Sequence, residues 1–181
     1  GGKEEPYDDN GHGTFCLSCA AGSGAASQGK YRGVADQADL IMIKAMDQNG
    51  GGTISTILRA MQWISDNRER YQIRVLSMSL GLEPGMLNPA FDALAMAAEA
   101  LWRQGVVVVA AAGNSGPRPG TINSPGSAAS VITVGAVDDR GSQPEVAAFS
   151  SRGQAQEHKP ELLYHADKCF SCGHCAEICP Q

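Results

Sequence analysis

Two polar residues of this chain are placed where enzymes often hold catalytic groups. His12 lies in the glycine-rich segment Asp9–Thr14, and Asn114 follows a run of four valines, Val106–Val109, and a short Ala-Ala-Gly stretch. An imidazole that opens a helix after a glycine turn can serve as a general base. An asparagine just beyond a parallel strand lies where open α/β sheets place their chemistry. Taken alone, both residue types are more often structural in such turns.

A second set of reactive side chains lies near the end of the chain. Its four cysteines, Cys169, Cys172, Cys175 and Cys179, follow the spacing C-x2-C-x2-C-x3-C-P. This run resembles the one with which bacterial ferredoxins hold a [4Fe-4S] cluster, where the fourth cysteine binds the other cluster of a two-cluster protein. The sequence has no second run, so a complete site needs Cys179 to bend back, a cysteine of the first cluster, or a second iron-sulfur chain. Zinc and unligated thiols are the alternatives.

The first cysteine cluster follows the histidine closely. Cys16 and Cys19 lie four and seven residues after His12, so all three share a face if the segment is helical. A thiol-imidazole metal site is one interpretation, and small buried cysteines are the commoner one. Clustered cysteines without an export signal favour metal or redox sites over a disulfide framework, and hence a reducing, cytoplasmic location.

Composition limits the possible partners. The chain has 181 residues, 43% of them hydrophobic and 18% charged, which suffices for a substantial core. Its formal charge of -5 and its lack of a Lys/Arg cluster argue against nucleic acid and anionic membrane surfaces as partners. No apolar run approaches the roughly 20 residues of a membrane span, and residues 1–7 lack the apolar core of a signal peptide.

Hydrophobic patterning predicts alternating strands and helices, and therefore a parallel sheet. The predicted strands are residues 38–43, 74–80, 106–109 and 131–137. One helix is expected after an N-cap at Thr53, and another from Asn88-Pro89 to Gly105. Their predicted buried stripes are Ile54, Ile57, Leu58, Met61 and Ile64 in the first, and Phe91, Leu94, Ala95, Ala98, Leu101 and Trp102 in the second.

The segments around His12 and Asn114 resemble those of subtilisin-like serine proteases. Further segments share the resemblance: residues 30–35, 73–81, 120–126, 131–136 and 149–153. The resemblance covers about residues 3–163, which predicts a partial peptidase domain at 1–163 and a ferredoxin-like segment at 164–181. It implies an α/β fold, a three-layer parallel sheet with flanking helices. That fold is expected to be incomplete, because the family's aspartate strand and serine helix would fall before residue 1 and after about residue 165.

The resemblance also implies site roles. His12 becomes the general base and Asn114 the donor to the oxyanion. Six residues are expected to form the walls of a groove that pairs with an extended peptide or protein substrate: Ser79, Leu80, Gly81, Ala111, Ala112 and Gly113. Neither Asp8 nor Asp9 fits the orienting carboxylate, and Ser150 and Ser151 are interpreted as loop hydroxyls rather than nucleophiles.

The implied function is therefore a serine endopeptidase domain that is inactive alone and needs no cofactor for peptide hydrolysis. A complementing fragment could supply the missing catalytic residues. An iron-sulfur electron-transfer protein and a non-catalytic peptide-binding module are the alternatives.

Overall fold

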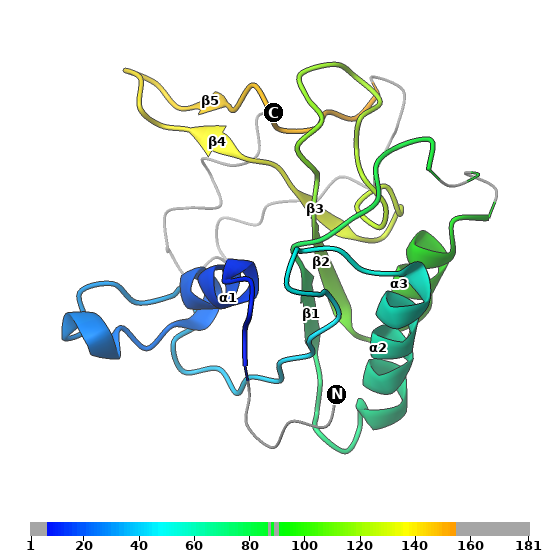
Figure 1. The fold of residues 1–181 in the computed structure, drawn as a ribbon, viewed down its shortest axis with the longest axis horizontal. Helices are drawn as coiled ribbons and strands as arrows, with labels where there is room; N and C mark the ends of the chain where they lie inside the picture. The colour runs from blue at the N-terminus through cyan, green and yellow to red at the C-terminus, as the bar shows by residue number, and fades with distance from the viewer. Residues whose placement is uncertain (1–6, 87, 89–90, 155–181) are drawn as a thin grey trace, which may run out of the picture. The chain divides into compact units, whose positions relative to one another are not determined.

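The computed structural model describes residues 7–86, 88 and 91–154 (Figure 1). Contacts divide the chain into two compact units, Gly1–Trp63 and Ile64–Gln181. The four tail cysteines and the predicted segment 164–181 lie outside the described residues.

The first unit begins with helix α1, His12–Ala21, followed by the short 3-10 helix η1, Ala25–Ser27. Two backbone hydrogen bonds join the end of α1 to the loop after η1: Gly33 N–H donates to the carbonyl of Gly22 over 2.8 Å, and Ala35 N–H to that of Ala20 over 2.8 Å. A Cβ atom at Gly33 would lie 2.4 Å from the nitrogen of Ala21. Only glycine therefore allows this close approach of two backbones.

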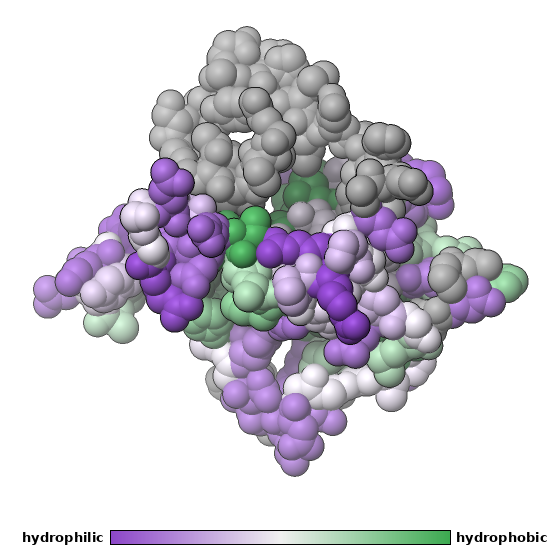
Figure 2. Space-filling model, turned by 90° about the horizontal axis from the view of Figure 1, so that it is seen from above, coloured by the Kyte–Doolittle hydropathy of each residue, from purple (hydrophilic) through white to green (hydrophobic). Residues whose placement is uncertain are grey.

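The strand predicted at residues 38–43 is wrong. The segment forms neither helix nor strand, and its apolar side chains are exposed, with Met42 57% exposed. A strand exists only through ladder hydrogen bonds to a neighbour, and no neighbour among the described residues provides them. Figure 2 shows hydrophobic residues, in green, reaching the surface beside polar ones, in purple.

Helix α2, Ile54–Asn67, runs across the boundary between the two units. Ile57, Met61 and Ile64 are buried, as the predicted stripe requires. In the second unit, Ser65 Oγ donates to Oε1 of Gln104 over 2.9 Å. The guanidinium of Arg68 donates to the Gln104 carbonyl. The last turn of α2 is thereby tied to the residue that ends the next helix.

A parallel sheet forms the centre of the second unit, as predicted. Its strands are β1, Val75–Met78, β2, Val107–Ala111, and β3, Ile132–Val134, in the order β1-β2-β3. Val75 pairs with Val107, and Val109 pairs with Ile132. A separate antiparallel pair, β4, Val137–Asp138, and β5, Glu145–Val146, follows.

Helix α3, Ala93–Arg103, packs against β2 (Figure 1). Leu94, Ala98 and Leu101 are buried. Along β2 the buried side chains alternate with more accessible ones, since Val108 and Ala110 are buried while Val107 is exposed. Three valines of the run, Val107–Val109, therefore lie in the central strand of the sheet, but only one face of this strand is fully covered by the described residues.

The predicted start of α3 is wrong. The N-cap is Asp92, whose Oδ1 accepts from the N–H of Ala95 over 3.0 Å and from Ser124 Oγ over 2.7 Å. Phe91, expected on the buried face, precedes the helix and is 74% exposed. Asn-Pro is a common helix start, but Asp92 here serves both the helix and the loop at Ser124, a tertiary contact that local sequence does not reveal. Gly105, with φ 88°, ends the helix as predicted.

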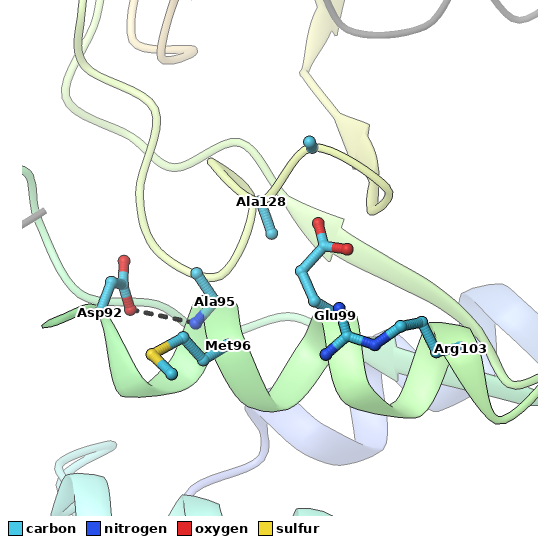
Figure 3. Close-up of a pocket in the computed structure, with 7 residues that line it drawn as sticks. Asp92, Ala95, Met96, Glu99, Arg103 and Ala128 are labelled. Carbon is cyan, nitrogen blue, oxygen red and sulfur yellow. Dashed lines mark hydrogen bonds between the residues drawn. The ribbon is translucent and has the colours of Figure 1, made fainter. Parts of the chain in front are cut away.

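Glu99 holds α3 to the loop before β3. Its two carboxylate oxygens accept from the N–H and the hydroxyl of Ser130, each over 2.8 Å. Glu99 and Arg103 line a hollow of about 360 Å³. Both side chains are labelled in Figure 3. The Ser130 N–H, its hydroxyl and the nearby Arg103 together keep the pKa of Glu99 below its usual value.

The substitution Glu99→Gln is expected to lower the free energy of unfolding by about 1–2 kcal/mol, because it removes the charge from a partly buried pair of hydrogen bonds. Folding lowers the pKa of Glu99. The stabilisation from its charge is therefore present above the unfolded-state pKa and is lost as the pH falls through the folded-state pKa. Guanidinium unfolding at neutral and acidic pH measures it. Arg103→Gln, which removes only the nearby charge, is the control and should cost clearly less.

None of the helices in the described part of the chain combines the length and apolar character needed to cross a membrane.

Candidate active site

His12 is the first residue of α1, as the sequence predicts. Gly11 precedes it in the left-handed conformation, with φ 95°, and the His12 N–H donates to Oδ1 of Asn10 over 3.2 Å. The side chain is exposed. Its imidazole contacts the sulfur of Cys16, at 3.9 Å from Nδ1 and 3.8 Å from Nε2. The turn thus fixes the backbone of His12 and leaves its ring accessible.

Asp8 organises this turn. Its carboxylate accepts from the N–H groups of Asn10, Gly11 and Thr14 over 3.0, 2.8 and 2.8 Å, and from the Thr14 hydroxyl over 2.7 Å. The Thr14 hydroxyl, followed by these N–H groups, holds the pKa of Asp8 far below its usual range. All four bonds need the ionised carboxylate, so Asp8 is a positioning residue for the start of α1.

Asp8→Asn is expected to loosen the turn that presents His12, because an amide cannot accept all four hydrogen bonds. Amide hydrogen exchange at Gly11 and Thr14 should accelerate several-fold. The wild-type turn should also weaken in acid, because folding lowers the pKa of Asp8. The stabilisation that its charge provides is present above the unfolded-state pKa and is lost as the pH falls through the folded-state pKa. The Asn variant should lack that acid dependence.

Asp9→Asn is the matched control for this prediction. Asp9 pairs with Lys44 at 2.6 Å and makes none of the bonds that close the turn. Equal acceleration in the two variants would contradict the role given to Asp8.

Asn114 lies beyond the end of β2 and is exposed. Its carboxamide makes no hydrogen bond to another described residue, while both of its neighbours are held. The Ser151 N–H donates to the carbonyl of Gly113 over 3.0 Å, and the Ser115 N–H donates to Ser151 Oγ over 3.1 Å. Ser151, only 5% exposed, therefore fixes the backbone on each side of a side chain that stays available.

Ser150 and Ser151 have structural roles, in agreement with their interpretation as loop hydroxyls. Ser150 is buried, and its Oγ accepts from the N–H of Ala136 over 3.0 Å. Both hydroxyls thus satisfy backbone donors of neighbouring loops.

The predicted groove residues lie at the carboxyl ends of β1 and β2. Ser79, Leu80 and Gly81 follow the last ladder pair of β1, Met78 with Ala110, and form no backbone hydrogen bond to other described residues. A hollow of about 230 Å³ lies at these strand ends, lined by Ser77, Met78, Ser79, Val109, Ala110, Ala111 and Val134. The free backbone groups leave this edge able to pair with an extended segment.

Asn123 joins the two predicted walls. Its N–H donates to the carbonyl of Ala112 over 2.9 Å. A Cβ atom placed on Gly113 would lie 2.5 Å from the Asn123 carboxamide carbon, and one placed on Gly81 would lie 3.1 Å from Asn123 Cβ. The Asn123 side chain therefore leaves no room for a Cβ atom at Gly113, whereas at Gly81 the nearest atom to such a Cβ would be the Ser124 carbonyl oxygen, at 2.8 Å. Its Oδ1 is buried without a hydrogen-bond partner among the described residues.

The structure thus brings the residues 79–81 and 111–113 together in the second unit, with Asn114 beside them. His12 belongs to the first unit. Within the described residues no group of three or more histidine, cysteine or acidic side chains could hold a metal ion. The expectation that Cys16 and Cys19 are buried is wrong, since Cys16 is half-buried and Cys19 is exposed.

Comparison with known proteins gives the family. The model of the subtilase family, peptidase S8, matches residues 1–178. The described residues accordingly belong to a serine protease domain. Its features on this chain are the parallel sheet, the exposed asparagine beyond a strand end and the histidine at a helix start. The chain belongs to the subtilase family.

Individual relatives cover most of this chain. It is 45% identical over 172 residues to serine protease AprX of Bacillus subtilis, covering 89% of the chain and 39% of AprX. This chain is also 39% identical over 160 residues to subtilisin DY of Bacillus licheniformis, and the match covers 86% of this chain and 53% of subtilisin DY. The structure of sphericase matches with a TM-score of 0.72 and 34% identity, covering 84% of this chain and 48% of sphericase. The chain thus spans about half or less of the length of these proteins.

The sequence did not reveal the positioning roles of three residues. Asp8, Ser151 and Asn123 act through backbone groups that only the fold brings to them. For Asp8 a local signal existed, because an aspartate ahead of an Asn-Gly turn and a helix start is a common capping residue.

Proposed function

We propose that this chain supplies the general base, the oxyanion donor and the substrate groove of a serine endopeptidase that acts on peptides and proteins. The observation that carries the proposal is Asn114, whose carboxamide is exposed and free among the described residues while its backbone is fixed on both sides. A donor held in this way needs little reorganisation when negative charge develops on a substrate oxygen.

Each residue has one step in this reaction. His12 takes the proton of a serine hydroxyl as that oxygen attacks the peptide carbonyl, and returns it to the leaving amine. Asn114 donates a hydrogen bond to the carbonyl oxygen as it becomes an oxyanion. Residues 79–81 and 111–113 pair with the extended substrate backbone and hold the scissile bond beside them.

The isolated chain is proposed to lack hydrolytic activity. Ser150 and Ser151 are buried and engaged with backbone N–H groups, so neither is an available nucleophile. The orienting carboxylate is also unassigned, because Asp8 is occupied in the turn before α1. A complementing segment would have to supply both groups.

Fluorophosphonate labelling tests this proposal. The purified chain and a full-length subtilase are treated with the same reagent, and modified residues are mapped by mass spectrometry. We expect labelling of the control alone. Stoichiometric labelling of one serine in this chain would show an activated nucleophile and overturn the proposed inactivity. Binding of a labelled peptide without cleavage, measured by fluorescence polarisation, would support the groove independently of catalysis.

The spacing of Cys169, Cys172, Cys175 and Cys179 supports a second function, binding of a [4Fe-4S] cluster. Anaerobic reconstitution followed by iron and sulfide analysis tests it. About four irons per chain are expected, and replacement of the four cysteines by serine should abolish their uptake. Zinc retention without iron uptake would favour the zinc alternative.

A further inference from the structure

The chain contains two Asn-Gly pairs, Asn10-Gly11 and Asn49-Gly50, and both lie in the first unit. An asparagine followed by glycine is the pair most prone to deamidation, because glycine has no side chain that would hinder attack of its backbone nitrogen on the carboxamide. The structure holds the two pairs differently.

The first pair is held by hydrogen bonds at every reacting group. Nδ2 of Asn10 donates to the carbonyl of Gln48 over 3.0 Å, and Oδ1 of Asn10 accepts from the His12 N–H over 3.2 Å. The Gly11 N–H donates to the Asp8 carboxylate over 2.8 Å. Attack of the Gly11 nitrogen on the Asn10 carboxamide therefore requires three hydrogen bonds to break, one of them to a charged acceptor.

The second pair is far less constrained. Asn49 and Gly50 are exposed, and the Asn49 carboxamide makes no hydrogen bond to another described residue. Oδ1 of Asp47 accepts from the N–H groups of Asn49 and Gly51 over 2.8 and 2.9 Å, which keeps the turn in place but leaves the carboxamide free. The Gly50 N–H donates to the Asp47 carbonyl over 3.1 Å. Within the described residues, this exposed turn bond is the one that has to open before the Gly50 nitrogen can react, and such bonds open at low cost.

We propose that Asn49 is a site of spontaneous deamidation, whereas the fold protects Asn10 from the same reaction. The Gly50 nitrogen forms a bond to Cγ of Asn49, the bond from Cγ to Nδ2 breaks, and ammonia leaves with the proton of the Gly50 N–H. Water then opens the resulting succinimide at either of its carbonyl groups. The product carries aspartate or isoaspartate at position 49.

This modification acts on the turn that presents His12. The Gln48 carbonyl, which accepts from Asn10 Nδ2, directly precedes Asn49, and a Cβ atom on Gly50 would lie 3.6 Å from the same Nδ2. Isoaspartate lengthens the backbone by one methylene group between these two neighbours of the Asn10 carboxamide. The contact with Asn10 is therefore expected to weaken, and with it the bond from the His12 N–H to Asn10 Oδ1.

Peptide mapping of the aged protein tests the proposal. The full chain is kept in mildly alkaline buffer, either folded or unfolded in guanidinium chloride, and mass spectrometry follows the conversion of amide to carboxylate in the peptides that contain Asn10 and Asn49. Both sites should react at similar rates in the unfolded chain. In the folded chain we expect Asn49 to react about ten-fold or more faster than Asn10, because two further hydrogen bonds protect Asn10. Electron-transfer fragmentation distinguishes isoaspartate from aspartate.

Equal rates at the two sites of the folded chain, faster reaction at Asn10, or no conversion at Asn49 would each overturn the proposal. Asn49→Gln is the control variant and should abolish the conversion at this position, since glutamine forms the corresponding ring much more slowly.

Hydrogen exchange tests the effect on the turn. Ageing should accelerate exchange of the His12 N–H several-fold in the wild type and leave it unchanged in Asn49→Gln, while the N–H of Ala95, in the second unit, is the internal reference. Unchanged exchange at His12 after complete conversion would contradict the expected effect. Since none of these readouts depends on hydrolysis, failure of this proposal and failure of the proposed peptidase role are separate outcomes.

Discussion

His12→Ala is expected to lower kcat for peptide hydrolysis by about a million-fold, the loss known for removal of the corresponding histidine in subtilisin. Without the imidazole no group takes the proton of the attacking serine or returns it to the leaving amine. The experiment uses a chimera in which residues 8–152 replace the aligned segment of AprX, so that the rest of the protease supplies the remaining groups. Hydrolysis of a fluorogenic peptide is the measurement.

The control for this prediction lies on the same helix. Cys19→Ser changes an exposed side chain of α1 and should leave kcat within about two-fold of the chimera. A His12→Ala chimera that retains a tenth or more of its parent's kcat would exclude His12 as the general base. If His12→Ala also left fluorophosphonate labelling unchanged, the activating group would have to lie elsewhere.

Asn114→Ala is expected to lower kcat of the same chimera by about 100- to 1,000-fold with little change in KM, the loss known for removal of the oxyanion donor of subtilisin. The reason for the selective effect is that the carboxamide is free in the ground state, so its hydrogen bond is made mainly as the oxyanion develops. Steady-state kinetics that separate kcat from KM measure it.

Ser115→Ala is the matched control for Asn114. The backbone N–H of Ser115, rather than its side chain, bonds to Ser151, so this change keeps the loop in place and should alter kcat by no more than about three-fold. A rise in KM with unchanged kcat in Asn114→Ala would instead show that the side chain binds substrate uniformly and is not an oxyanion donor.

Several features of the molecule follow from short stretches of sequence. The glycine turn before His12 starts α1, the stripe containing Ile57, Met61 and Ile64 gives a helix with one buried face, and three of the four valines lie in the central strand. These features depend on residues close together in the chain, because turn chemistry and helical periodicity are local properties. The positions of His12 and Asn114 at a helix start and a strand end were predictable for the same reason.

Tertiary structure alone decided the remaining features. Residues 38–43 have a strand-like sequence, yet they form no strand because a ladder needs a partner. Asp92 replaced the expected cap because Ser124 bonds the same carboxylate, and Ser151, which lies 36 residues after Ser115 in the chain, fixes the neighbours of Asn114. Sequence therefore determined which side chains could carry the chemistry and which local elements hold them. Long-range hydrogen bonds, which no local pattern encodes, decided how firmly those side chains are positioned.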